Sequence, residues 1–108
     1  MNEQAVIVHF EYAADSLAPL FELEERLEAA ITAAGVGEFD GNEIAVDGSA
    51  GSLYMYGPDA DALYSVVRPL LNASVCLRNA QARLRYGPPQ QGVRERLVAI
   101  AAPEAERN

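Results

Sequence analysis

Hydrophobic and polar residues alternate along four stretches of the chain, a pattern typical of β-strands with one buried face. These stretches are 5–12, 43–47, 52–56 and 80–86. In each stretch we expect one set of alternate residues to face a core and the other set to face outward. The residues expected on the outward face are Ile7, His9, Glu11, Glu43, Ala45, Asp47, Tyr54, Tyr56, Gln81, Arg83 and Arg85.

Gly, Pro and Asp residues separate these stretches and indicate how they connect. The cluster Asp-Gly-Ser-Ala-Gly at 47–51 predicts a hairpin between the second and third strands. After the Pro-rich turn at 87–92, residues 94–100 fit either a fifth strand or a short helix. A strand is favoured because Val98 and Ile100 continue the alternation that begins with two arginines.

Two other stretches carry apolar residues at spacings of three and four, which indicates amphipathic helices. The first helix is expected over 16–34, with Asp15 or Ser16 as its N-cap and Gly35 just after its end. The second is expected to have Pro58 at its first position. Its apolar stripe is Leu63, Val66, Val67 and Leu70, and Pro69 is expected to kink or end the helix near its last turn.

The resulting order, strand-helix-strand-strand-helix-strand, resembles the ferredoxin-like α+β arrangement over residues 5–86. That resemblance implies a two-layer sandwich, with two helices on one face of an antiparallel sheet of strand order 4-1-3-2, with or without a fifth strand. The stretches 41–43 and 54–61 are similar to those of small bacterial proteins with no assigned function, and the fold itself specifies none. We expect a single domain over 1–102 and a frayed tail at 103–108.

Charge is unevenly distributed along the 108 residues, whose formal net charge is −8. Residues 1–61 contain thirteen acids and one arginine, whereas residues 62–108 contain seven arginines and three acids. In the expected strand order the acids of the second strand and the arginines of the fourth lie at opposite edges of one sheet. Neighbouring strands would also bring Arg83 or Arg85 to Glu11, and His9 beside a tyrosine.

Composition excludes several kinds of site. The chain has no lysine, one histidine and one cysteine, so it lacks a Lys nucleophile, a Cys/His zinc cluster and an internal disulfide. Cys76 is expected to be a small buried residue near the start of the fourth strand. The acidic segment 38–47 does not match a calcium-binding loop. We therefore expect no metal and no cofactor.

Compartment and partners follow from the same features. The N-terminal segment lacks a basic region, and its uninterrupted apolar run, 5–8, is too short for a signal peptide or a membrane span. A lone cysteine favours the reducing cytoplasm. The net negative charge argues against nucleic acid and anionic membranes as partners.

These observations favour a small acidic interaction protein without catalytic residues, hence not an enzyme. It is expected to bind a protein partner, either a second copy of itself or a basic, toxin-like protein, through its open sheet face or its acidic side. The candidate binding residues are His9, Glu11, Glu43, Asp47, Tyr54, Tyr56, Arg83 and Arg85. The alternative is a regulatory domain with a small-molecule pocket near His9, Tyr54, Tyr56 and Arg83.

Overall fold

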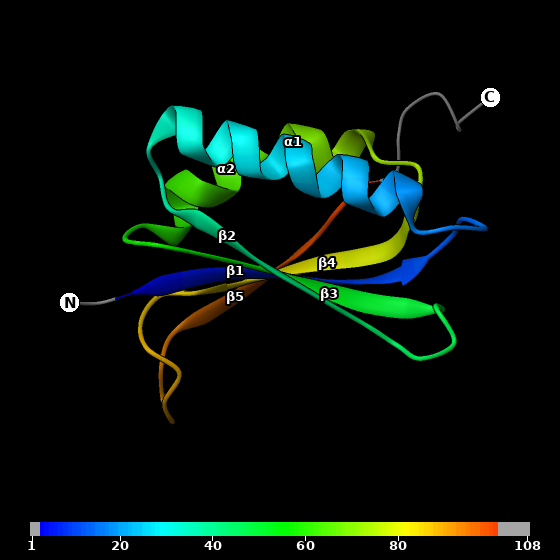
Figure 1. The fold of residues 1–108 in the computed structure, drawn as a ribbon. Helices are drawn as coiled ribbons and strands as arrows, with labels where there is room; N and C mark the ends of the chain where they lie inside the picture. Colours follow the sequence, from blue (N-terminus) through cyan, green and yellow to red (C-terminus); the bar gives the residue numbers. More distant parts are fainter. Residues whose placement is uncertain (1–2, 102–108) are drawn as a thin grey trace.

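Five antiparallel strands and two helices make up the part of the chain, residues 3–101, that the computed structural model describes (Figure 1). Both helices lie on one face of the sheet, which gives an α+β sandwich of two layers. The elements are β1 (Gln4–Tyr12), α1 (Ala18–Ala34), β2 (Glu38–Ile44), β3 (Ala50–Gly57), α2 (Ala60–Ala73), β4 (Leu77–Arg85) and β5 (Glu95–Ala99). The tail expected at 103–108 lies outside the described residues.

The strand order is β2-β3-β1-β4-β5, which differs from the expected order 4-1-3-2. The difference is the fifth strand, because the sheet runs 5-4-1-3-2 when it is read from the β5 edge. Residues 95–99 pair antiparallel with β4, so the strand interpretation of this segment is confirmed. As a consequence, β4 is an internal strand, and its arginines have a neighbour on both sides.

The core lies between the sheet and the helices. Alternate residues of β1, β3 and β4 face the helices and are buried, as their spacing predicts. Leu20, Leu23, Leu27 and Ile31 of α1 are buried as expected. On α2, Leu63 and Val67 are buried as expected, Val66 and Leu70 are only partly buried, and Tyr64 and Leu71 are buried in addition. Cys76 is buried directly before β4, in agreement with its interpretation as a small core residue.

The second strand lies several residues earlier than the alternation suggests. It covers Glu38–Ile44, and residues 45–49 form a turn instead of continuing the strand. Val46, expected to face the core, is therefore fully exposed. A bulge at Gly41, with φ of 139°, shifts the pairing of β2 with β3. The extra residue lets both Phe39 and Ile44, five positions apart, pack against the core.

The helix boundaries also differ from those expected. The N-cap of α1 is Leu17, so neither Asp15 nor Ser16 occupies the N-cap position, although the Ser16 hydroxyl accepts from the Ala18 N–H at 3.4 Å. Gly35 follows the end of the helix in the left-handed conformation. Asp59 is the N-cap of α2, accepting from the Ala62 N–H at 3.1 Å, so Pro58 precedes the helix.

Pro69 does not end α2, since the helix continues to Ala73. Proline removes the N–H that would bond to the carbonyl of Ser65. Both residues lie on the exposed side of α2, where water can hydrogen-bond that carbonyl. No helix within residues 3–101 is long and apolar enough to cross a membrane.

Candidate binding face

The face of the sheet opposite the helices carries the outward side chains predicted for β1, β3 and β4, together with Glu43 of β2. Pairing of the strands arranges them in rows that cross the sheet. The central row runs from Tyr54 on β3 through Ile7 on β1 and Arg83 on β4 to Leu97 on β5. Leu97 is 60% exposed, so this row ends in a large apolar side chain in contact with solvent.

The rows on either side repeat this arrangement. One contains Glu38, Tyr56, Ala5, Arg85 and Glu95, and the other contains Glu43, Ser52, His9, Gln81 and Ala99. Two consecutive rows thus have a tyrosine on one side of β1 and an arginine on the other side. This placement of tyrosines on one side of β1 and arginines on the other depends on the register of the strands, and no local pattern in the sequence contains it.

His9 lies opposite Ser52, and its Nδ1 is 2.8 Å from the Ser52 hydroxyl. The tyrosines are displaced from it by one row, because Tyr54 lies opposite Ile7. The expectation that a tyrosine lies directly beside His9 is therefore wrong. His9 lines a shallow hollow with Glu43 and Ser52, whereas Tyr56 lines a separate hollow.

On the acidic side of the face, Glu43 and Tyr54 form a hydrogen bond. The Tyr54 hydroxyl donates to Oε1 of Glu43 at 2.5 Å. This bond, together with desolvation of the phenol and the negative charge of Glu43, raises the pKa of Tyr54 above its ordinary value. Tyr54 is consequently held toward β2 as a neutral donor over a wide pH range.

On the basic side, the two arginines of β4 have different environments. Arg85 is only 8% exposed, and its Nε donates to the carbonyl of Gly87 at 2.6 Å, at the start of the β4–β5 loop. The Nε of Arg83 is buried and has no hydrogen-bond partner within residues 3–101. A buried N–H of a charged group that lacks an acceptor is costly, so Arg83 favours an incoming acceptor.

Two candidate residues lie elsewhere than expected. Glu11 pairs across the sheet with Arg78, and its carboxylate accepts from Asn79 at 3.0 Å, so the expected contacts with Arg83 or Arg85 are wrong. The register explains this, since both arginines lie opposite the other half of β1. Asp47 lies in the turn after β2, where it accepts two hydrogen bonds from Ser49, and does not belong to the sheet face.

The charges on this face are separated as the strand order implies. Glu38 and Glu43 lie on β2, and Arg83 and Arg85 lie on β4, with β3 and β1 between them. Glu95 on β5 adds one acid beyond the arginines, next to Arg85. The face is thus acidic at one edge, aromatic and apolar in the middle, and basic between the middle and the other edge.

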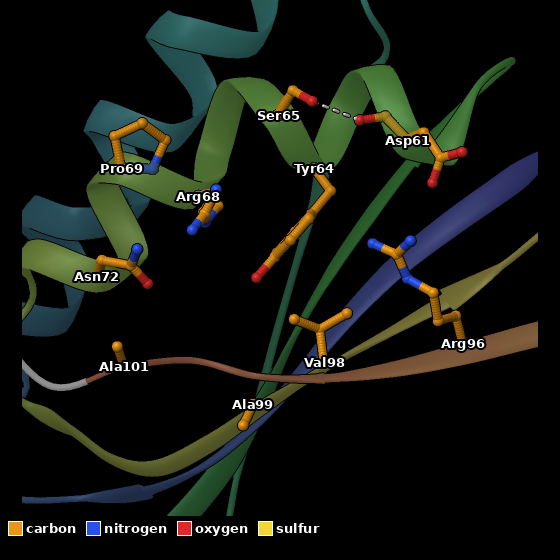
Figure 2. Close-up of a pocket in the computed structure, with 10 residues that line it drawn as sticks. All are labelled: Asp61, Tyr64, Ser65, Arg68, Pro69, Asn72, Arg96, Val98, Ala99 and Ala101. Atoms are coloured by element: carbon orange, nitrogen blue, oxygen red, sulfur yellow. Dashed lines mark hydrogen bonds between the residues drawn. The ribbon is translucent and has the colours of Figure 1, made fainter.

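The helix side of the molecule carries a second candidate site, which sequence reasoning missed. A groove of about 650 Å³ lies between α2 and β5, and Tyr64, Arg68 and Arg96 are among the side chains that line it (Figure 2). The alternation of residues 94–100 was the one available signal, because it placed Arg96 on the same face as Val98. Which helix lies over that face could not be inferred from it.

The Glu43–Tyr54 hydrogen bond leads to a test by alkaline titration. Glu43→Gln is expected to lower the pKa of Tyr54 toward its ordinary value of about 10, because the anionic acceptor is lost. In the native protein the Glu43–Tyr54 hydrogen bond contributes to the stability of the folded state below about pH 10. This contribution disappears as the pH rises through the raised pKa of Tyr54. The measurement is the ultraviolet absorbance of tyrosinate, with Tyr54→Phe identifying the Tyr54 step.

Glu38→Gln is the matched control, because Glu38 lies on the same strand but pairs with Tyr56. It is expected to leave the Tyr54 step almost unchanged. Equal shifts in the two glutamine variants would show that general charge, and not the hydrogen bond, governs Tyr54.

Within residues 3–101, no group of three or more His, Cys, Asp or Glu side chains is arranged to hold a metal ion. Comparison of the chain with protein-family models, with curated proteins and with solved structures found no match.

Proposed function

We propose that this protein is a cytoplasmic protein-binding module of ferredoxin-like type, whose open sheet face associates with a second copy of the chain. The observation that carries the proposal is the placement of complementary groups, tyrosines and arginines, on the two sides of β1. Tyr54 and Arg83 flank Ile7 in one row, and Tyr56 and Arg85 flank Ala5 in the next. The row of Tyr54, Ile7 and Arg83 is the one open to a partner, because Ala5 is inaccessible to solvent and Arg85 is only 8% exposed. With a tyrosine on one side of β1 and an arginine on the other, this row is self-complementary, as a two-fold interface requires.

Charge and chemistry select the direction of the symmetry axis. An axis along β1 places β3 of one copy over β4 of the other, so that Tyr54 faces the guanidinium of Arg83. An arginine over a tyrosine ring is an attractive contact, and it grows stronger when water is excluded. An axis across the strands would instead place the acidic β2 strands over each other, which like charges disfavour.

The apolar residues of the face, the half-buried Ile7 and the exposed Leu97, fit the same arrangement. The axis along β1 brings Ile7 of the two copies together and places Leu97 over the β2 region of the partner copy. The face spans about 20 Å across its strands, from the usual strand spacing of about 4.8 Å. Glu38 and Glu95 approach each other at the solvated rim, where screening keeps the cost of this like-charge contact small.

The cytoplasmic part of the proposal is supported by the buried free thiol of Cys76. The alternative partner is a basic, toxin-like protein, which would bind at the acidic β2 edge alone. If this protein stays monomeric in solution, that partner is favoured over a second copy of the chain.

The test uses two exposed apolar residues, one on the face and one away from it. Leu97 lies on β5 and is 60% exposed, whereas Val75, in the α2–β4 connection, is 68% exposed. The native protein is expected to form a dimer of twice the 11.6 kDa chain mass. Leu97→Asp is expected to weaken the dimer at least about tenfold, because it removes apolar contact and adds an acid facing β2. Sedimentation equilibrium over a range of concentrations measures both.

Val75→Asp is expected to dimerise like the native protein, since it adds the same charge outside the face. A native chain that stays monomeric at every concentration and salt level would overturn the self-association proposal. So would equal weakening by Leu97→Asp and Val75→Asp, because that would point to net charge in place of the face.

A further inference from the structure

The groove between α2 and β5 lies on the helix side of the sheet, away from the face proposed for self-association. One wall comes from α2, where Tyr64, Arg68 and Asn72 follow at intervals of four residues. The other comes from β5, where Arg96 and Val98 face the helices. Figure 2 shows the Tyr64 ring projecting from α2 between the side chains of Arg68 and Arg96. Side chains from two distant segments therefore converge on one hollow.

Positive charge dominates this hollow. Burial raises the pKa of the Tyr64 phenol, and the nearby positive charges of Arg68 and Arg96 oppose that rise. Tyr64 thus remains a neutral hydroxyl with two guanidiniums close to it. A hydroxyl donor together with two arginines is a set that hydrogen-bonds carboxylate or phosphate oxygens.

The neighbouring charges do not cancel this pair. Asp61, at one end of the groove, accepts a hydrogen bond from the Tyr86 hydroxyl at 2.7 Å. Arg94 lies over the Tyr86 ring, with its Cζ 4.8 Å from the ring centroid. Asp61 and Arg94 both contact Tyr86. Asp61 is the one acid in the lining of the groove, so Arg68 and Arg96 together exceed its charge by one positive charge.

The rest of the lining is small or apolar. Pro69, Val98, Ala99 and Ala101 leave space next to the charged groups. The volume of about 650 Å³ is in the range of small-molecule sites. An inorganic ion would leave much of that space unfilled, so the shape favours an anionic group attached to a compact apolar body.

We propose that the α2–β5 groove binds a small organic anion, a carboxylate or a phosphate monoester, between Arg68 and Arg96, with the Tyr64 hydroxyl as a further donor. The apolar body of the ligand would lie along Val98 and Pro69. This site is independent of the proposed self-association, since the two surfaces lie on opposite sides of the sheet.

The experiment is a titration of isotopically labelled protein, followed by backbone amide NMR shifts. The probes are benzoate, phenyl phosphate, inorganic phosphate and uncharged benzyl alcohol. Saturable shifts confined to residues 61–72 and 96–101 are expected with benzoate or phenyl phosphate. The tighter of these two identifies the anionic group, and benzyl alcohol is expected to bind more weakly than both.

Exposed arginines supply the variants, so loss of folding is not the expected outcome. Arg68→Gln and Arg96→Gln are each expected to weaken binding of the tighter probe at least about fivefold, because each removes a charge-assisted hydrogen bond. Arg78→Gln removes the same charge from β4, outside the groove, and is expected to leave the affinity unchanged.

Three results would overturn the proposal. Shifts that fail to saturate, or that spread over arginines throughout the chain, would indicate non-specific attraction of anions. Equal weakening in Arg78→Gln would show that net charge is responsible. Inorganic phosphate binding as tightly as phenyl phosphate would remove the apolar part of the site.

Discussion

Leu27→Ala is expected to destabilise the protein by about 3 kcal/mol, within the range measured for buried leucines. Leu27 lies in α1, is fully inaccessible to solvent and belongs to the core between the helices and the sheet. Truncation removes apolar area from the core and leaves a cavity that the packed neighbours fill only in part. Urea denaturation at one fixed, low protein concentration gives the change in unfolding free energy.

Val46→Ala is the control, and it also tests the corrected boundary of β2. Val46 is fully exposed in the turn after β2, whereas the alternation of 43–47 would place it in the core. The expected change is within about 0.5 kcal/mol, as for most surface positions. A loss comparable to that of Leu27→Ala would mean that β2 extends through Val46 after all.

Gly57→Ala is expected to lower the free energy of unfolding by about 3 kcal/mol, because the added Cβ would clash with backbone atoms. Gly57 ends β3, and a Cβ there would lie 2.2 Å from the carbonyl oxygen of Val36 and 3.2 Å from the Cα of Gly37. Gly37 is equally constrained, since its own Cβ would lie 2.0 Å from the Tyr56 carbonyl oxygen. Relief requires the backbone where α1 leads into β2 to move away from β3, which disturbs the packing beside it.

Gly48→Ala separates this clash from the ordinary cost of replacing a glycine. Gly48 has a φ of 75°, and a Cβ there would have no atom within 4 Å. Only the left-handed backbone opposes alanine, at a cost of about 1 kcal/mol. The same urea experiment compares the two variants, and equal losses would contradict a close contact between residues 36–37 and 56–57.

The two proposals assign different roles to the two sides of the sheet. The open face offers a self-complementary surface for a second copy, and the α2–β5 groove offers a site for a small anion. β5 contributes to both, through Leu97 on one side and Arg96 on the other. The matched variants Leu97→Asp and Arg96→Gln can therefore be exchanged between the two experiments, and each is expected to affect only its own.

Local periodicity was sufficient to predict the strands and helices whose side chains follow one period throughout. In β1 and β4 the side chains alternate without interruption over the stretches predicted, so outward residues such as Ile7 and Arg83 were identified correctly. The predicted position of the second strand was wrong because the bulge at Gly41 reverses the alternation within β2. The alternation that remained, at 43–47, begins at the strand's end and continues into a turn.

The composition of each face is a local property, because the direction of a side chain follows from its own strand. Which residues meet is a non-local property, because it depends on how segments far apart in the chain pair. Glu11 lies opposite Arg78 instead of Arg83 because of the β1–β4 register, and Tyr54 and Arg83 flank Ile7 for the same reason. Arg68 and Arg96 share a groove only because β5 adds to the β4 edge beneath α2. Period and spacing along the chain contain no information about that contact, so it emerged only from the packed structure.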